Sequence, residues 1–363
     1  MPQARRWGFI QALVHINQEY FLKNCNHSRA ALLAILSCAC FGASAQSSVT
    51  VYGVADAYLQ IGSGGRGSTK TLQSGGLQGS RVGFRGTEDL GGGLKALFQL
   101  ESGLALDTGT VTQGGTFWGR QAYVGLSGDF GTTTAGRQYS PLFVAIDTVD
   151  PFGTGLGSVY SSGIVTTLGG TRVNNSIIYS SPKVQGFSGK LLAAAGENVT
   201  GRSLGADVRY STEKFVVAMT FTQQDRFAPG TVKGSSTLVS GMYDFGAFKL
   251  MGVAQSVKHA NLLAVNDDRE EFFAGVQVPV ATGTIKAVYG GGKVKNVAGT
   301  KASEFSLGYD HALSKRTTLY VLGSKIDNGA LTAFTTAGAT GSGPSTATGH
   351  DVKALQIGMR HRF

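Results

Sequence analysis

The chain has 363 residues, of which 54 are glycine and only 15% are charged, and its formal net charge is +10. Glycine is about twice its usual share of ~7%. The glycines lack the three-residue period of collagen, and a hydrophobic content of 42% excludes a disordered chain. The basic excess forms no cluster with interleaved aromatic residues, which disfavours nucleic-acid binding. This composition is typical of strands separated by turns and favours an all-β protein.

The first 45 residues have the features of a targeting segment. Arg29 precedes the apolar run 30–36, and Ala43-Ser44-Ala45 follows a few residues later. A basic flank, an apolar region too short to span a bilayer and a small-residue cleavage site together define a secretory signal peptide. We therefore expect residues 1–45 to be a cleaved signal peptide and residues 46–363 to form one exported domain.

The mature chain contains neither cysteines nor a long apolar run. Cys25, Cys38 and Cys40 all precede the expected cleavage site, so disulfides contribute nothing to the mature fold. No stretch of about 18 apolar residues follows Gln46, which excludes a transmembrane helix. If the mature chain enters a membrane, it must do so as a closed sheet, because hydrocarbon offers no partner to an unpaired backbone group.

Hydrophobic residues alternate with a period of two from the start of the mature chain. Between residues 49 and 61, Val51 and Leu59 share one face, whereas Tyr52 and Asp56 share the other. One face suits lipid or a protein interface and the other suits water. The pattern predicts an amphipathic β-strand.

The same alternation continues in hairpins that have short turns at one end and long loops at the other. Strands 81–87 and 94–101 flank the glycine turn Glu88–Gly93. Long connections follow at the opposite ends: Gly62–Gly79, Leu104–Thr116, Gln138–Gly170 and Asp327–Gly349. About sixteen such segments predict a transmembrane antiparallel barrel wide enough for an aqueous channel. A soluble β-sandwich would also alternate, but the signal peptide, the strand number and the loop asymmetry favour the barrel.

The last strand carries a further indication of membrane assembly. Ile357, Met359, His361 and Phe363 share one face, and Phe363 ends the sequence. An aromatic residue at this phase resembles the signal that outer-membrane proteins present to the barrel-assembly machinery. We therefore expect Phe363 to act as an assembly signal.

Several blocks of sequence resemble the general porins of β-proteobacteria, a trimeric, sixteen-stranded family. The resemblance covers essentially all of the mature chain. It is carried by residues 47–56 (SSVTVYGVAD), 79–91 (GSRVGFRGTEDLG), 119–126 (GRQAYVGL), 136–138 (GRQ), 175–179 (NSIIY) and 360–363 (RHRF). It implies a homotrimer in outer-membrane lipid and lipopolysaccharide, with the third loop folded inward to narrow the pore.

In such a pore the function lies in a constriction whose width and charge select solutes. The resemblance places Arg81, Arg120 and Arg172 on a basic ladder facing the inward loop. The polar phase of Arg81 supports its place in the lumen. In strict alternation Arg120 shares a face with apolar residues, so its place in the lumen requires a bulge. Secondary lumen candidates are Arg85, Lys95 and Glu101.

The predicted inward loop is Gln138–Gly170, and it contains few acidic residues. Asp147 and Asp150 are the natural carboxylates to oppose the arginines, with capping of local turns as the alternative role. Because few acids face several arginines, we expect the channel to prefer anions.

Catalysis and cofactor binding find little support in the sequence. His259, His311, His350 and His361 are dispersed, and no G-x-S-x-G or H-E-x-x-H motif occurs. His311 lies next to Asp310, but at a turn where exposure to solvent explains both. We expect a porin for passive diffusion of small hydrophilic solutes, without a cofactor or metal. The alternatives are a substrate-specific channel for phosphate or organic acids and, less favoured, a barrel enzyme or adhesin.

Overall fold

A computed structural model describes residues 48–197, 201–225, 233–259 and 267–363. The expected signal peptide, residues 1–45, lies outside the described residues. Among the described residues, no helix is both long enough and apolar enough to cross a membrane.

The described chain forms one antiparallel sheet and a single helix, α2, over Pro141–Val149. The strands are β1 Ser48–Ser63, β2 Ser68–Ser74, β3 Arg81–Gly91, β4 Leu94–Gly103, β5 Gln121–Gly128, β6 Gly131–Tyr139, β7 Arg172–Ser180, β8 Phe187–Ala194, β9 Ser203–Ser211, β10 Phe215–Gln224, β11 Gly234–Asp244, β12 Lys249–Lys258, β13 Arg269–Val280, β14 Gly283–Val294, β15 Ala302–Ala312, β16 Thr317–Asn328 and β17 Val352–Arg362.

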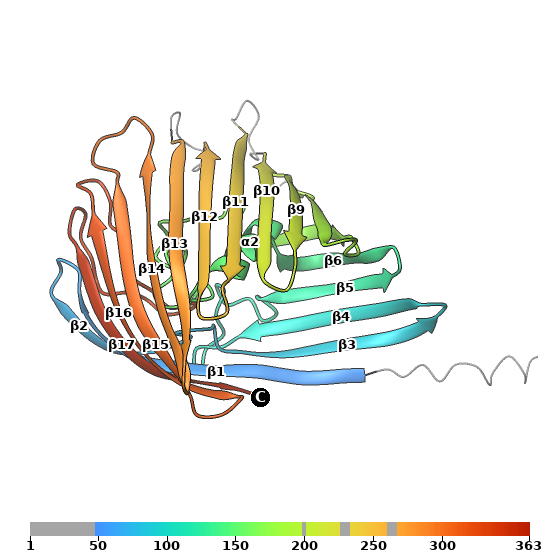
Figure 1. Cartoon of the computed structure of the whole chain (residues 1–363), viewed down its shortest axis with the longest axis horizontal. Coiled ribbons are helices and arrows are strands. Elements are labelled where there is room, and N and C mark those ends of the chain that lie inside the picture. Colours follow the sequence, from blue (N-terminus) through green and yellow to red (C-terminus); the bar gives the residue numbers. More distant parts are fainter. Residues whose placement is uncertain (1–47, 198–200, 226–232, 260–266) are drawn as a thin grey trace, which may run out of the picture.

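The sheet closes on itself, because β17 pairs with β1 along ten residue pairs from Val54↔Arg362 to Ser63↔Lys353. Strands β2 and β3 pair with the same edge of β1, β2 with residues 57–63 and β3 with residues 48–54. They therefore share one position, and the barrel has sixteen positions, as predicted (Figure 1). Within the described residues, every strand except β2, which pairs with β1 alone, has a strand partner on both sides, as a barrel in a membrane requires.

Strand β2 was not predicted from the sequence, where residues 62–79 read as one long loop. In its sequence, STKTLQS, Leu72 is the one apolar residue, so the segment lacks the regular alternation that marks the other strands. It forms because β1 extends beyond β3 and needs a partner there. Between β2 and β3 the chain bends inward, and the Asp56 carboxylate accepts hydrogen bonds from the backbone N–H of Gly76 at 3.1 Å and of Gln78 at 2.9 Å.

The alternation predicted from the sequence is present along the barrel wall. In β1, Leu59 and Ile61 are exposed on the outer face, whereas Asp56 and Gln60 are fully buried inside. The short turns lie at one end of the strands, and the long connections, including 104–120, 140–171 and 329–351, lie at the other. This end-to-end asymmetry is typical of outer-membrane barrels.

The main hydrophobic core lies inside the barrel and holds the connection between β6 and β7 against the wall. Ser140 caps α2 by accepting a hydrogen bond from the Phe143 N–H at 3.2 Å, and Pro141 occupies the first turn. Leu142, Ile146 and other buried residues of this loop pack with buried side chains of the wall, among them Leu238, Val253, Phe273, Val288 and Leu322. Helix α2 contacts β8 to β12 (Figure 1). The inward loop spans residues 140–171, because β6 continues to Tyr139.

Candidate functional site

A cavity of about 380 Å³ lies between the inward loop and the opposite wall. Its lining includes Arg81, Arg120 and Arg172 from the wall side and Asp147 from α2. These four residues, all singled out in the sequence, therefore lie around one space.

Each of the three arginines lies at, or just before, the start of a strand. Arg81 is the first residue of β3, Arg172 is the first residue of β7, and Arg120 immediately precedes β5. No bulge is needed to turn Arg120 inward, because the residue lies before the strand and its backbone N–H donates to the Glu101 carbonyl at 3.1 Å. Gly79 leaves room for its guanidinium, since a Cβ at that position would lie 2.8 Å from Arg120 Nη1.

Glu101, which does not line the cavity, neutralises part of the charge of the arginine cluster. Its Oε1 lies 2.7 Å from Arg120 Nε, and its Oε2 lies 3.8 Å from Arg81 Nη1. The Tyr52 hydroxyl donates to the same carboxylate at 2.9 Å. With a relative exposure of 2%, Glu101 holds the two arginines in place instead of opposing them across the lumen.

Tyr139, which no sequence pattern marked as functional, connects Arg120 to Arg172. Its hydroxyl oxygen accepts hydrogen bonds from Arg120 Nη2 at 2.7 Å and from Arg172 Nη2 at 2.9 Å. The Arg172 guanidinium carbon lies 4.6 Å from the centroid of its ring, and the ring stacks on Phe143 of α2 at 4.7 Å. Tyr139 therefore joins the arginine cluster to the inward loop. A tyrosine at the end of an alternating strand gave no signal of this role.

Of the two loop carboxylates, Asp147 lines the cavity. It accepts a hydrogen bond from the Thr154 hydroxyl at 2.9 Å. Burial raises the pKa of Asp147 above its ordinary value, and the nearby charges of Arg81 and Arg120 partly oppose that rise. Asp147 is therefore a carboxylate whose charge in the slot is sensitive to acid.

Asp150 is turned into the loop and is not among the residues lining the cavity. Its carboxylate accepts hydrogen bonds from the backbone N–H of Phe152 at 2.8 Å and of Thr154 at 3.3 Å, and from the Ser158 hydroxyl. Burial raises its pKa to about 6. This geometry fits the capping alternative, and it gives Asp150 a place in the loop's own turn.

The remaining sequence candidates lie nearer the short-turn end. Arg85 faces inward with its guanidinium carbon 5.1 Å from the centroid of the Tyr52 ring. Lys95 is exposed beside the β3–β4 turn. The backbone of Phe363 exchanges two hydrogen bonds with Gly53, at 3.0 and 3.1 Å, and so helps to close the barrel.

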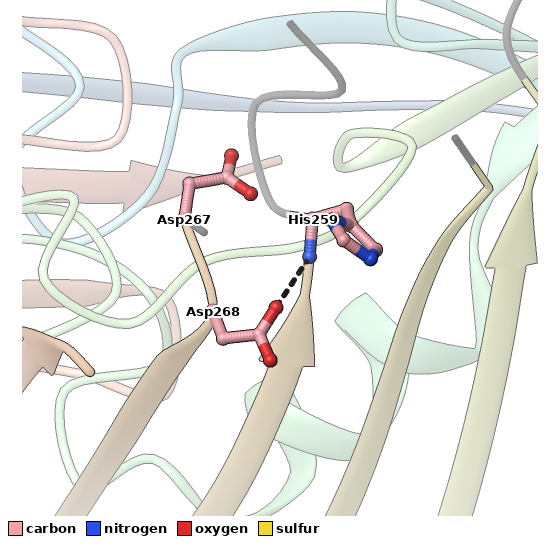
Figure 2. A group of neighbouring side chains, drawn as sticks. All are labelled: His259, Asp267 and Asp268. Carbon is pink, nitrogen blue, oxygen red and sulfur yellow. Dashed lines mark hydrogen bonds between the residues drawn. The ribbon is translucent and has the colours of Figure 1, made fainter. Parts of the chain in front are cut away.

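A second group of possible ligand side chains lies outside the lumen cavity, where β12 ends and β13 begins. Figure 2 shows His259, Asp267 and Asp268, whose ligand atoms lie within 4.8 Å of one another. The Asp268 carboxylate accepts a hydrogen bond from the His259 backbone N–H at 3.1 Å. That bond ties the end of β12 to the residues that precede β13.

The charges around the cavity are unequal. Three guanidinium groups and one carboxylate line it, and Glu101 lies behind two of the arginines. In a narrow aqueous slot such an excess concentrates anions and repels cations.

Comparison with known proteins gives four findings. The family model described as Gram-negative porin matches residues 30–331. Outer membrane porin protein 32 of Delftia acidovorans is 32% identical over 92% of this chain and 100% of its own length. The solved structure of an anion-selective porin from Comamonas acidovorans is 29% identical, with a TM-score of 0.78, and covers 87% of this chain and 100% of that one. A trimer form of OmpT from Vibrio cholerae shares the fold, with a TM-score of 0.64 at 16% identity over 87% and 99% of the two chains.

Proposed function

Because the chain belongs to the Gram-negative porin family, we propose that the slot between the arginines and the inward loop makes it an anion-preferring channel. As an outer-membrane porin, the protein forms a water-filled pore for the passive diffusion of small hydrophilic solutes. The roles proposed here are that Arg81, Arg120 and Arg172 form the attracting wall of the constriction and that Asp147 is the opposing charge.

The single observation that carries the proposal is the one-sided charge of the slot. Three guanidinium groups face the cavity, and Asp147 is the one acidic residue among the described residues that line it. A permeating anion exchanges part of its hydration for guanidinium contacts, whereas a cation meets like charge. The relative from Comamonas acidovorans is described as anion-selective, which supports the same assignment.

The test is the zero-current potential of the purified protein in a planar bilayer that separates two concentrations of potassium chloride. We expect the sign given by chloride permeating faster than potassium. A potential of the opposite sign would show that cations are preferred and would overturn the proposal.

A second measurement separates general diffusion from a substrate-specific channel for phosphate or organic acids. In liposome swelling with solutes of graded size, a general porin gives rates that fall with size and rise linearly with concentration. Saturation by inorganic phosphate or by a small carboxylate would favour the specific channel.

We propose further that three copies assemble through the outer wall of β1 and β3 to β6. A groove of about 600 Å³ lies there. Its lining includes the small residues Gly86, Ala96, Gly125 and Ala135, and small residues let packed walls approach closely.

Across β8 to β12, by contrast, a chain of aromatic contacts runs near the short turns, from Phe187 and Tyr210 to Phe245 and Phe248. Such a girdle suits lipid and lipopolysaccharide at the membrane interface.

Two further proposals concern export and chemistry. Cleavage after Ala45 should leave Gln46 as the first residue of the exported protein, which its intact mass would test.

We propose no enzymatic role, because the neighbours Asp310 and His311 point to opposite faces of β15. Asp310 pairs with Lys286 at 2.6 Å, whereas His311 contacts the hydroxyls of Thr282 and Tyr309 at 3.2 and 3.3 Å.

A further inference from the structure

Strand β17 contributes a basic side chain to the lumen that lies outside the predicted ladder. Leu355, Ile357 and Met359 are exposed on the outer face, whereas Ala354 and Gln356 are buried on the inner face. Because side chains alternate along a strand, Arg362 shares the inner face with Gln356.

The strand register places Arg362 in line with the arginine wall. Val54 of β1 pairs with Arg362 on one side and with Arg81 on the other. Two strand spacings separate the two arginine backbones, which is about 10 Å. Arg362 ends β17 at the same end of the barrel as the short turns, so it extends the basic wall from the slot toward that opening.

A short segment of chain links the Arg362 guanidinium to the slot. Arg362 Nε and Nη2 donate to Gln78 Oε1 at 3.3 and 3.1 Å, and Arg81 Nε donates to the neighbouring Gly79 carbonyl at 2.8 Å. Gln78 and Gly79 both line the slot cavity. The backbone N–H of Gln78 is itself held by the Asp56 carboxylate at 2.9 Å. The guanidinium therefore has a fixed place at the edge of the cavity.

The charge of Arg362 is less compensated than that of Arg81 and Arg120. Arg81 and Arg120 share Glu101. Arg362 is exposed, and among the described residues no carboxylate oxygen lies within 4.0 Å of its guanidinium. An uncompensated cation acts over about one Debye length, ~8 Å at physiological salt, which covers much of a narrow lumen.

We propose that Arg362 is a further selectivity-determining residue, which raises the concentration of anions at the short-turn entrance to the slot. The proposal rests on the proposed anion preference and adds a second position at which the pore acts on anions. Small inorganic anions and carboxylates are the solutes concerned. An ion that passes the slot then meets a second, weaker attraction, which favours transfer along the pore over trapping within it.

The test changes the charge at residue 362 in a pore that is already assembled. The three cysteines of the sequence all precede residue 46, so Arg362→Cys places one thiol in the exported protein. After insertion into a bilayer, the thiol is modified with a cationic or an anionic methanethiosulfonate reagent. We expect the cationic adduct to restore the chloride-to-potassium permeability ratio and the anionic adduct to lower it about twofold or more. Equal ratios for the two adducts would overturn the proposal.

Two further variants separate charge from folding and from position. Arg362→Lys retains the charge and should retain the native ratio. Lys315→Cys places the same thiol in the exposed β15–β16 turn on the same rim, and its two adducts should give ratios that differ much less. If native protein shows no anion preference, the proposed function fails. A difference between the adducts at position 362 would still support the role of Arg362.

Discussion

The two walls of the slot carry opposite charges and hold them by different means. On the barrel wall, Arg81, Arg120 and Arg172 are fixed by Glu101 and Tyr139 with their guanidinium groups beside the cavity. On the loop wall, most polar groups are used to hold the loop itself. The comparison teaches that local packing, more than the number of charged residues, decides which charges a solute meets.

The largest effect should come from removing two arginines of the barrel wall. Arg81→Ala with Arg120→Ala should raise conductance and remove most of the anion preference, because the slot loses bulk and two of its three cations. Reversal potentials and single-channel conductance measure both changes. As a control, Arg202→Ala with Lys233→Ala removes two cations that pair with Asp225 at an outer strand end and should leave selectivity near native. Native selectivity in the arginine pair variant would contradict the assignment.

A smaller loss is expected from Tyr139→Phe, which keeps the ring and removes the oxygen shared by two arginines. Without that acceptor, Arg120 and Arg172 repel each other with less restraint, so the anion preference should fall by less than in the double arginine variant. Tyr179→Phe is the matched control, because that hydroxyl donates to the Phe130 carbonyl at an exposed site, at 2.7 Å. Equal reversal potentials for the two variants would argue against the bracing role of Tyr139.

Lowering the pH should strengthen the anion preference, because it protonates Asp147 on the inward loop. Because burial raises the pKa of Asp147, its carboxylate gains a proton at a higher pH than an exposed aspartate, whose pKa is about 3.9. Protonation removes the negative charge from the slot, so the chloride-to-potassium permeability ratio should rise as the pH falls from about 7 to about 4. Asp147→Asn should show the higher ratio at neutral pH and a flatter pH profile. A ratio that falls in acid would contradict this role.

The smallest effect on selectivity is expected from Asp150→Ala. The change removes an acceptor used by Phe152, Thr154 and Ser158, which should destabilise the loop by about 1–3 kcal/mol. Open-channel noise and protease sensitivity of the loop should increase, while the reversal potential stays near native. A clear shift in reversal potential without added noise would instead indicate that the charge of Asp150 acts in the slot.

Much of the fold follows from alternation and turns, whereas the site depends on contacts that those patterns do not contain. Strand β2 escaped prediction because a single apolar residue, Leu72, gives no alternating pattern. Arg120 seemed to face lipid only because β5 was extended by one residue beyond its start. Tyr139 and Arg362 act through partners distant in sequence, and Asp150 is oriented by the backbone of its own turn. The contacts of Tyr139 and Arg362 have no local sequence signature, whereas the contacts of Asp150 match the turn-capping alternative for that residue.

The contrast between the walls is tested most directly by comparing Arg120→Gln with Asp147→Asn. Their reversal potentials are measured in the same potassium chloride gradient and referred to the native pore. We predict shifts of opposite sign, with Arg120→Gln moving toward the cation-selective limit and Asp147→Asn moving further toward the anion-selective limit. Shifts of the same sign, or none in either variant, would contradict the view that these two walls set the charge of the pore.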